Sequence, residues 1–335
     1  MTIRVAINGF GRIGRLTLRA LAQSSRNDIE VALINTPGDV ATSSHLFEFD
    51  STHGRYQGAV SAGDDWMDIG AGKIKMTQIR APEELPHKEL GIDLVMECAG
   101  IFNKRADAAR HLDAGAKRVL LSAPGADADL TVVYGVNDDQ LNASHHIVSN
   151  ASCTTNCLAP VAKVCQDAFG IDSGYMTTIH AYTNDQNILD NRHKDLRRAR
   201  SAGQSMVPTS TGAAKAVGLV LPELAGKLDG SAIRVPTANV SAVDFTFIAK
   251  RDVTADEINQ ALIAASQGPM KGVLGINDRP LVSIDFNQDP HSSIADITQT
   301  QVLDGRFVRI LTWYDNEWGF SNRMLDTSVA MMRAS

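Results

Sequence analysis

The sequence predicts an α/β protein, with a doubly wound parallel sheet in its first half and an α+β domain with a mostly antiparallel sheet in its second half. Three observations lead to this prediction. Short apolar strands alternate with helical stretches through the first half, a glycine-rich turn follows the first strand, and strands follow one another directly in the second half. Strands that alternate with helices form parallel sheets with both faces covered.

The individual elements follow from the apolar pattern. First-half strands are predicted at residues 3–8, 30–35, 93–98, 118–122 and 147–150, with helices between them at 12–24 and 105–114. A further helix begins at Ser152, because apolar residues recur there at helical spacing, namely Leu158, Val161, Cys165 and Phe169. The later strands are predicted at 231–237, 240–248, 281–286 and 307–314.

Three parts of the chain are expected on this basis. Residues 1–151 form the first domain, residues 152–316 form the second, and residues 317–335 form an amphipathic helix that packs back on the first domain. The polar, basic stretch 182–203 is predicted to be an ordered functional loop, because long loops in compact domains are mostly functional.

Composition excludes several classes of protein. The 335 residues are 44% hydrophobic and 21% charged, which is typical of a globular protein. The net charge of −6 has the wrong sign for coating nucleic acid, and no apolar run reaches the ~18 residues of a membrane span. The sequence opens on a strand instead of a secretory leader, and four cysteines are too few for a disulfide framework. We therefore expect a cytoplasmic protein with no nucleic-acid or membrane partner.

A glycine-rich turn after the first strand predicts a dinucleotide site. Gly9, Gly11 and Gly14 match G-x-G-x-x-G between a strand that ends at Asn8 and a helix that begins near Arg12. The first glycine permits the turn, the second lets a pyrophosphate approach the backbone, and the third allows close helix packing. The helix N-terminus offers N–H groups and a positive dipole end to the phosphates. The first domain is therefore predicted to be of the Rossmann type.

The end of the second strand bears on the choice of dinucleotide. A carboxylate is expected there to bind the ribose 2′-hydroxyl, but Asn35 and Thr36 occupy the strand end. Asp39 lies past a Pro-Gly turn and is a poor substitute. The missing charge removes repulsion of a 2′-phosphate, which favours NADP or dual use, with Thr36 supplying a hydroxyl. The alternative is that NAD binds through Asn35.

A cysteine at a strand-to-helix junction is the candidate nucleophile. Cys153 lies in the first turn of the predicted helix, where the helix N-terminus favours thiolate and N–H groups can hold an oxyanion. His180, at the end of the strand 175–179, is the candidate base. Cys157 lies one turn deeper and is expected to be a buried spectator. Further ligands at suitable spacing are missing, so no metal site is expected.

Five blocks of the sequence resemble phosphorylating glyceraldehyde-3-phosphate dehydrogenases. They are residues 6–15, 149–157, 180–186, 208–217 and 313–319, in the order and spacing of that family. The resemblance implies that Cys153 attacks the aldehyde to form a hemithioacetal, and that His180 takes the proton and assists hydride transfer. It also implies a thioester that inorganic phosphate cleaves to 1,3-bisphosphoglycerate, a reversible step shared by glycolysis and gluconeogenesis.

The same resemblance assigns binding residues. It implies that the substrate phosphate and the attacking phosphate are held by Ser152, Thr154, Thr183, Arg198, Thr211, Gly212 and Arg234. It implies that the cofactor is held by Arg12, Ile13, Arg80, Ser122 and Asn316, in addition to the glycine turn. Hydroxyls, backbone N–H groups and arginine forks suit phosphate oxygens.

The resemblance also implies a homotetramer. Asn191 and Arg192 stand where strictly NAD-using members have an apolar Leu-Pro pair. In the family tetramer this loop approaches the adenosine ribose of a neighbouring subunit, so Arg192 is expected to meet a 2′-phosphate there. This second departure again favours use of NADP.

Two alternatives are kept beside this interpretation. The first is erythrose-4-phosphate dehydrogenase, which releases its acyl group to water and has a stretch similar to residues 289–293. Residues 182–185 and 208–215 match the phosphorylating enzymes instead. The second is a catalytically silent dinucleotide-binding or redox-sensing regulator, since a fold does not guarantee activity. The presence of both Cys153 and His180 favours an enzyme.

Overall fold

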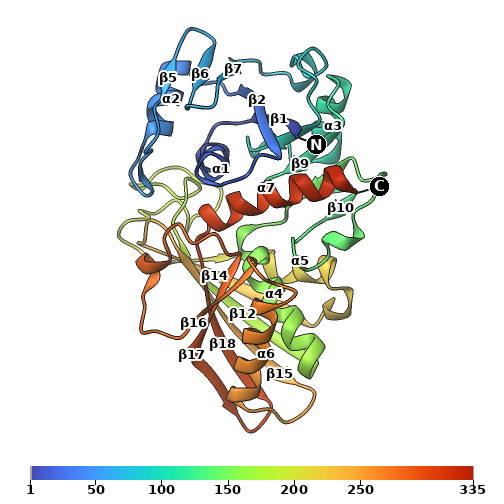
Figure 1. The fold of residues 1–335 in the computed structure, drawn as a ribbon. Helices are drawn as coiled ribbons and strands as arrows, with labels where there is room; N and C mark the ends of the chain where they lie inside the picture. The colour runs from blue at the N-terminus through green and yellow to red at the C-terminus, as the bar shows by residue number, and fades with distance from the viewer. Residues whose placement is uncertain (1, 335) are drawn as a thin grey trace. The chain divides into compact units, whose positions relative to one another are not determined.

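The computed structural model describes residues 2–334, which divide into two compact units. The chain up to Ser152 and the segment from Ser321 onward form the first unit, and Cys153–Phe320 forms the second. Figure 1 labels most of the helices and strands of each unit.

A nine-stranded sheet is the centre of the first unit. Its strands are β1 (Ile3–Asn8), β2 (Ile29–Asn35), β5 (Ser61–Ala62), β6 (Trp66–Asp68), β7 (Lys73–Thr77), β8 (Leu94–Glu97), β9 (Arg118–Leu121), β10 (Leu130–Thr131) and β11 (Ile147–Ser149). They lie in the order β10-β11-β9-β8-β1-β2-β7-β6-β5. All neighbours from β10 to β7 are parallel, whereas β6 pairs antiparallel with β7 and β5. The predicted parallel, Rossmann-type sheet is confirmed.

The helices of the first unit pack on this sheet through apolar faces. They are α1 (Arg12–Gln23), α2 (Val40–Glu48), α3 (Arg105–Asp113) and most of α7 (Trp318–Arg333), with short 3-10 turns η1 (Pro82–Glu84) and η2 (Asp138–Gln140). Ala108 of α3 belongs to a buried apolar cluster with Val95 of β8 and Val119 of β9. In α7, Thr327 Oγ1 donates to Asn150 Oδ1 at 2.8 Å. A separate hairpin is formed by β3 (Phe49–Asp50) and β4 (Gly54–Arg55).

The carboxyl ends of three adjacent parallel strands lie in one line. Asn8 at the end of β1 is in register with Asn35 at the end of β2 and with Glu97 at the end of β8. In open α/β sheets, ligands bind outside this carboxyl edge. The glycine turn leaves the sheet from the same edge, since it begins directly after Asn8.

A seven-stranded sheet is the centre of the second unit. Its strands are β12 (Ile171–Ala181), β13 (Val207–Ser210), β14 (Leu228–Val235), β15 (Ser241–Ala249), β16 (Leu274–Asn277), β17 (Ser293–Leu303) and β18 (Phe307–Tyr314). They lie in the order β13-β14-β12-β15-β18-β17-β16. Four of the six neighbouring pairs are antiparallel, and β12-β14 and β16-β17 are parallel. The expected mostly antiparallel sheet is confirmed.

Two details of the second unit differ from the predictions. Its strands do not simply follow one another, because α5 (Ala213–Val220) and α6 (Ala255–Gln267) lie between them, as do the 3-10 turns η3 (Pro222–Leu224) and η4 (Ser283–Phe286). The predicted strand 281–286 is wrong, since η4 occupies most of it. Asp285 Oδ2 accepts a hydrogen bond from the Val282 N–H at 2.9 Å, and this local bond competes with strand pairing.

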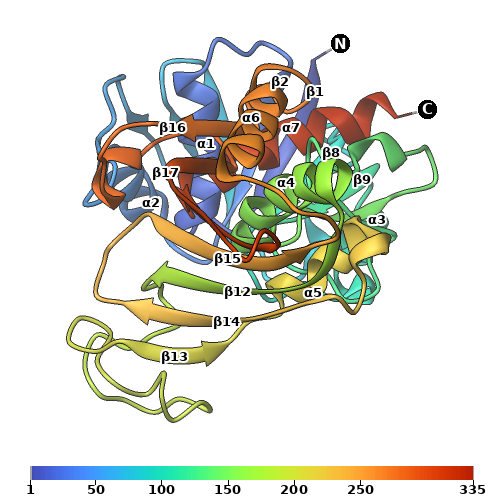
Figure 2. The same ribbon diagram turned by 90° about the horizontal axis from the view of Figure 1, so that it is seen from below.

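The β13 edge of this sheet carries the long polar stretch between β12 and β13. Figure 2 shows β15, β12, β14 and β13 side by side, with the connecting segment looping out beyond β13. Along β12, buried residues alternate with more exposed ones, and Tyr175 and Ile179 on the exposed side are 48% and 39% accessible. One face of an antiparallel sheet commonly remains uncovered in this way.

Candidate functional site

Cys153 is the first residue of α4 (Cys153–Phe169), as the strand-to-helix junction predicts. Two residues earlier, Ala151 has the left-handed backbone angle φ +56°, which costs a non-glycine residue about 1–2 kcal/mol. The Ala151 N–H donates to Ser149 Oγ at 3.1 Å and helps to hold this turn. The side chain of Cys153 is partly exposed, whereas Cys157, one helical turn on, is fully buried.

The structure brings His180 to the cysteine. His180 lies near the end of β12, and its Nε2 is 3.6 Å from Cys153 Sγ. Its other ring nitrogen, Nδ1, lies 2.6 Å from the Ala181 carbonyl oxygen and 2.6 Å from Arg234 Nη1. Arg234 reaches this position because β14 pairs with β12 in the register that sets Arg234 opposite His180. Thiol, imidazole and guanidinium therefore form one cluster.

Burial sets the charge state of this cluster. It lowers the pKa of His180 to about 3, and the nearby Arg234 cation acts in the same direction. Burial also raises the pKa of the Cys153 thiol, although Arg234 and hydrogen bonds from Thr154 oppose this shift. The expected lowering of the thiol pKa by the helix N-terminus is therefore outweighed by desolvation. Both shifts favour the uncharged pair, a thiol beside a neutral imidazole.

The other three cysteines lie in surroundings that oppose ionisation of the thiol. Burial raises the pKa of Cys98 and of Cys157 to about 12, and it raises the pKa of Cys165 further. Cys157 lies between Ser293 Oγ at 3.7 Å and Thr312 Oγ1 at 3.9 Å. Cys153 has the cation of Arg234 as a favourable partner. Cys153 also has the imidazole of His180 at 3.6 Å, so a base and a cation both lie beside its thiol.

Sequence reasoning missed Tyr314, which lies behind the cysteine and histidine. Its ring packs edge-on against His180 with 5.9 Å between ring centroids. Its buried hydroxyl is 2.9 Å from both Thr154 Oγ1 and Thr178 Oγ1. Tyr314 thereby ties the first turn of α4 to β12 and fixes the relative positions of Cys153 and His180. The signal in the sequence is its place at the end of β18 and inside the motif block 313–319.

Several predicted phosphate ligands gather around the β13–β14 edge. Arg198 donates to Thr209 Oγ1 from Nε at 3.0 Å and from Nη2 at 2.6 Å, and its Nη1 pairs with Asp185. The Thr183 N–H donates to Gln186 Oε1 at 2.9 Å, and the Ala213 N–H donates to Thr211 Oγ1 at 3.2 Å. The remaining members of the predicted set do not share one arrangement: Gly212 is the N-cap of α5, Thr154 contacts Tyr314, and Ser152 belongs to the first unit.

Two donors in this region have no partner among the described residues. They are Arg234 Nε and Gln186 Nε2, both buried. A buried N–H without an acceptor costs about 1–3 kcal/mol, and an anion bound here would remove that cost. Arg234 and Gln186 therefore provide buried N–H donors of the kind that bind an oxyanion.

The glycine turn of the first unit fits a dinucleotide. Gly9 has φ +93°, and a side chain there would overlap the backbone of Ala99, while one at Gly14 would overlap Gly9. A Cβ at Gly11 would meet no protein atom, so the space above this residue is open to a ligand. Helix α1 also begins with no side-chain cap and no acidic residue in its first turn, which leaves its N-terminus suited to an anion.

The two residues predicted to lie at the ribose, Asn35 and Thr36, differ in their hydrogen bonding. All four hydrogen-bonding positions of the Asn35 amide are taken: Nδ2 donates to Asn8 Oδ1 and the Ile79 carbonyl, and Oδ1 accepts from Thr77 Oγ1 and the Ile79 N–H. The Asn35 side chain is thus committed within the protein. Thr36 is 9% exposed, and its N–H donates to the Thr77 carbonyl at 3.0 Å.

Asp39, the poor substitute for the ribose carboxylate, is also committed. It caps α2, accepting from the Thr42 N–H at 2.7 Å and from Thr42 Oγ1 at 2.9 Å. Of the other predicted cofactor residues, Arg12 pairs with Asp50 at 2.6 Å, Ile13 and Ser122 are half-buried, and Arg80 is exposed. In the second unit, Arg192 is exposed, and the buried Asn316 accepts from Ser241 Oγ at 2.8 Å.

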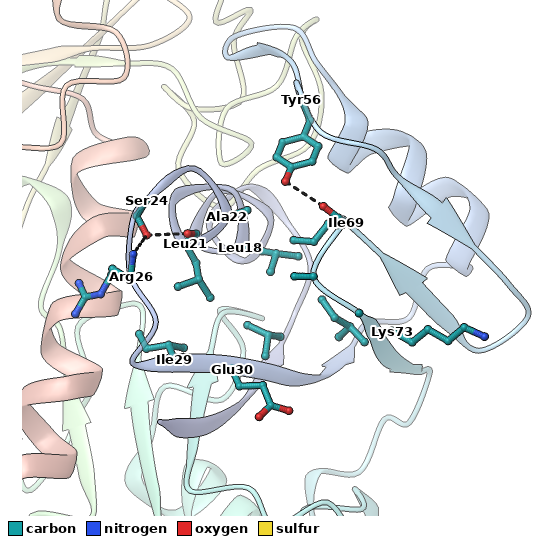
Figure 3. Close-up of a pocket in the computed structure, with 15 residues that line it drawn as sticks. Leu18, Leu21, Ala22, Ser24, Arg26, Ile29, Glu30, Tyr56, Ile69 and Lys73 are labelled. Atoms are coloured by element: carbon teal, nitrogen blue, oxygen red, sulfur yellow. Dashed lines mark hydrogen bonds between the residues drawn. The ribbon is translucent and has the colours of Figure 1, made fainter. Parts of the chain in front are cut away.

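A hollow of about 550 Å³ lies in the first unit, and no predicted cofactor residue lines it (Figure 3). It is bounded by the C-terminal half of α1, by the start of β2 and by the turn before β7. Its walls combine apolar side chains such as Leu18, Leu21 and Ile29 with the charged Arg26, Glu30 and Lys73. Tyr56 Oη donates to the Ile69 carbonyl at 3.2 Å. Because β2 and β7 begin here, the hollow lies at the amino edge of the parallel strands, opposite the glycine turn.

The described residues contain neither a cluster of metal-ligating side chains nor a membrane-spanning helix. Across residues 2–334, no group of three or more His, Cys, Asp or Glu side chains is arranged to hold a metal ion. In the same range, no helix has the length and apolarity needed to cross a bilayer.

Comparison with known proteins gives a consistent result. The family model described as "Glyceraldehyde 3-phosphate dehydrogenase, NAD binding domain" matches residues 3–105, and the one described as "Glyceraldehyde 3-phosphate dehydrogenase, C-terminal domain" matches residues 152–316. The chain is 64% identical over 331 residues to the glyceraldehyde-3-phosphate dehydrogenase of Xanthobacter flavus, with 99% of both chains covered. The enzymes of that name from Cereibacter sphaeroides and Pseudomonas aeruginosa are 64% and 59% identical, with at least 99% of each chain covered.

Proposed function

Because the chain belongs to the glyceraldehyde-3-phosphate dehydrogenase family, we propose that it converts D-glyceraldehyde 3-phosphate, inorganic phosphate and an oxidised nicotinamide dinucleotide to 1,3-bisphosphoglycerate. The observation that carries this proposal is the contact of 3.6 Å between Cys153 Sγ and His180 Nε2, with Arg234 against the other ring nitrogen. The relatives named above are all glyceraldehyde-3-phosphate dehydrogenases, so the erythrose-4-phosphate alternative is not favoured.

The residues of the second unit suit the covalent chemistry. As Cys153 Sγ bonds to the aldehyde carbon, His180 Nε2 takes the thiol proton and returns it to the carbonyl oxygen, which becomes the hemithioacetal hydroxyl. A dinucleotide bound at the glycine turn would supply the hydride acceptor for oxidation of this adduct to a thioester, and His180 Nε2 would take the hydroxyl proton in that step. Phosphate then attacks the thioester carbon and the C–S bond breaks, so that the sulfur departs as thiolate and regains its proton from His180.

Anion binding belongs to the same proposal. Arg234 supports it, because its Nε is buried without a partner and its charge lies beside the cysteine. We assign Thr183, Arg198, Thr211 and Gly212, together with Ser152 and Thr154, to the two phosphates on the family pattern. Gln186 joins this set as a residue that the sequence did not suggest, since its Nε2 is also buried without a partner.

NADP use at least equal to NAD use is the finer part of the proposal. Thr36 stands where a carboxylate would repel a 2′-phosphate, and Asp39 is held as the cap of α2. Arg192 adds an exposed cation on the long loop. Asn35 has no free side-chain position for either dinucleotide, so it is assigned a structural role. A hundredfold preference for NAD in kcat/KM would contradict this part.

A homotetramer in the cytoplasm completes the proposal. The long loop exposes Ile188, Leu189, Leu196 and Met206, of which Ile188 and Leu196 are more than 80% accessible. Tyr175 and Ile179 add apolar area on the uncovered sheet face. Exposed apolar surface of this extent is typical of an association surface. Light scattering on the purified protein would test the assembly.

The reaction itself is tested by paired initial rates. Turnover of glyceraldehyde 3-phosphate should require inorganic phosphate, and it should stop once one thiol per chain is alkylated. Unchanged turnover without phosphate would support release of the acyl group to water and would contradict the proposal. Loss of a single thiol with full activity retained would exclude the cysteine mechanism.

A further inference from the structure

In the first unit, four neighbouring strands each end in a polar residue, and the four side chains form a row. Thr77, Asn35, Asn8 and Glu97 are the last residues of β7, β2, β1 and β8, which are adjacent in the sheet. Thr77 Oγ1 donates to Asn35 Oδ1 at 2.9 Å, Asn35 Nδ2 to Asn8 Oδ1 at 2.7 Å, and Asn8 Nδ2 to Glu97 Oε2 at 2.5 Å. These four side chains are called the terminal row below.

The backbone of Ile79 fixes the direction of the terminal row. Its N–H donates to Asn35 Oδ1 at 2.9 Å, and its carbonyl accepts from Asn35 Nδ2 at 2.8 Å. A turned-over Asn35 amide would set donor against donor and oxygen against oxygen. Asn35 Nδ2 must therefore donate to Asn8 Oδ1, which leaves Asn8 Nδ2 directed at residue 97. The row needs a proton-free acceptor at that position.

Glu97 receives donors from two further directions. The Ala99 N–H donates to Glu97 Oε1 at 2.7 Å, and His111 Nε2 lies 3.0 Å from Glu97 Oε2. His87 Nε2 in turn lies 3.1 Å from His111 Nδ1, and burial lowers the pKa of His87 to about 4, which keeps this ring neutral. Glu97, His111 and His87 are all 0% exposed. A carboxylate this deeply buried is stable only with several donors.

The terminal row supports the segments that line the dinucleotide site. Gly9 follows Asn8 directly, and it packs so tightly on Ala99 that no side chain fits between them. Glu97 bonds to both sides of this contact, through the Asn8 side chain and the Ala99 N–H. At the other end of the row, the Thr36 N–H donates to the Thr77 carbonyl at 3.0 Å. The glycine turn and the strand end at the ribose position are thus joined by one set of hydrogen bonds.

We propose that Glu97 is a positioning residue for the dinucleotide: as the acceptor that ends the terminal row, it holds the Gly9 turn and Ala99 in the conformation that binds the pyrophosphate. This inference rests on the proposed function, because it takes the glycine turn to bind NAD or NADP. Glu97 itself touches neither substrate nor cofactor in this account. Its effect is transmitted through Asn8 and Ala99.

Dinucleotide affinity in substitution variants tests this role. Glu97→Gln keeps the size of the side chain but places an amide N–H opposite one of the N–H groups that donate to Glu97. The Kd for NAD should therefore rise about tenfold or more. It is measured by calorimetry without aldehyde. The control is Asp93→Asn. Asp93, directly before β8, accepts a hydrogen bond from the Arg4 N–H of β1 at 2.9 Å. It thus joins β1 and β8 at their amino ends, whereas Asn8 and Glu97 join them at their carboxyl ends. The Kd of this control should stay within about threefold of wild type.

A double variant separates positioning from a general loss of structure. Asn8→Asp/Glu97→Gln returns an acceptor for Asn35 Nδ2 and gives the new amide at 97 a partner, so it should recover most of the lost affinity. An unchanged Kd in Glu97→Gln would overturn the proposal. So would a double variant that fails to fold or that binds no tighter than the single variant. Wild-type protein that binds no dinucleotide would contradict the proposed function instead.

Discussion

Cys153 Sγ lies 3.6 Å from His180 Nε2, and the opposite ring nitrogen of His180 lies between an acceptor and a donor. Nδ1 is 2.6 Å from the Ala181 carbonyl oxygen and 2.6 Å from Arg234 Nη1, and it can serve only one of them at a time. With its proton directed to Ala181, His180 offers a lone pair at Nε2 and is a base toward the thiol. With Nδ1 accepting from Arg234, Nε2 carries the single ring proton and cannot take the thiol proton. The proposed reaction therefore uses the first tautomer, and the imidazolium formed when Nε2 takes the thiol proton is the acid that returns it.

The base role predicts a partial loss of activity in His180→Asn. General acid–base catalysis contributes about 10²–10⁴-fold, so kcat should fall by that factor while the thiol remains able to react slowly. Cys153→Ser should abolish aldehyde oxidation altogether. Steady-state kinetics of the two variants, beside Cys157→Ser as a buried cysteine control, would check this. Normal turnover in Cys153→Ser would contradict the mechanism.

The position of Arg234 predicts the direction of a change in thiol reactivity. Its cation lowers the pKa of Cys153 against the larger effect of burial, so Arg234→Gln should raise that pKa. The rate of Cys153 alkylation by iodoacetamide should then be lower at neutral pH. The increase of this rate with pH should occur at higher pH than in the wild-type protein. Arg309→Gln removes an equal charge from the pair with Asp244 on another strand, and should leave the profile unchanged. Equal or faster alkylation in Arg234→Gln would oppose this assignment.

The sequence predicts the parallel sheet and the glycine turn well, because both depend on local pattern. Apolar runs and the spacing of Gly9, Gly11 and Gly14 are read directly from neighbouring residues. The 3.6 Å contact to His180 and the approach of Arg234 depend on the register of β12 with β14, which no local pattern contains. The commitment of the Asn35 amide to Ile79, 44 residues away, is of the same kind.

Local competition explains the errors. Residues 281–286 are apolar enough for a strand, but the bond from the Val282 N–H to Asp285 favours a 3-10 turn. The helix N-terminus at Cys153 favours thiolate, yet burial dominates, and the extent of burial is set by tertiary packing that includes Tyr314.

His87 predicts a loss of stability at mildly acid pH. Burial lowers its pKa from 6.5 to about 4, so the unfolded chain binds more protons than the folded chain between these values. The free energy of unfolding should therefore be unaffected by His87 above about pH 6.5 and should decrease as the pH falls toward 4. Between pH 7 and pH 5 the decrease should be about 2 kcal/mol. His87→Gln retains a donor for His111 without the titration, so its urea midpoint should change less between these two pH values. An equal change in both proteins would contradict the prediction.

Thr36 predicts how cofactor preference can be altered. Thr36→Asp adds a carboxylate at the ribose position, which repels a 2′-phosphate and offers an acceptor to a 2′-hydroxyl. The kcat/KM for NADP should fall at least tenfold, and the value for NAD should stay the same or rise. Parallel kinetics with both dinucleotides would check this, with NAD as the internal control. An equal loss with both would show only local damage and would contradict the assignment.

The covalent intermediate on Cys153 is the most direct test of the account. Protein mixed with glyceraldehyde 3-phosphate and NAD in the absence of inorganic phosphate should be quenched in acid, digested and measured by mass spectrometry. The account predicts a 3-phosphoglyceroyl group on the Cys153 peptide, close to one per chain, which disappears when phosphate is added before the quench. An unmodified Cys153 during turnover, or an acyl group on another residue such as Cys157, would contradict it.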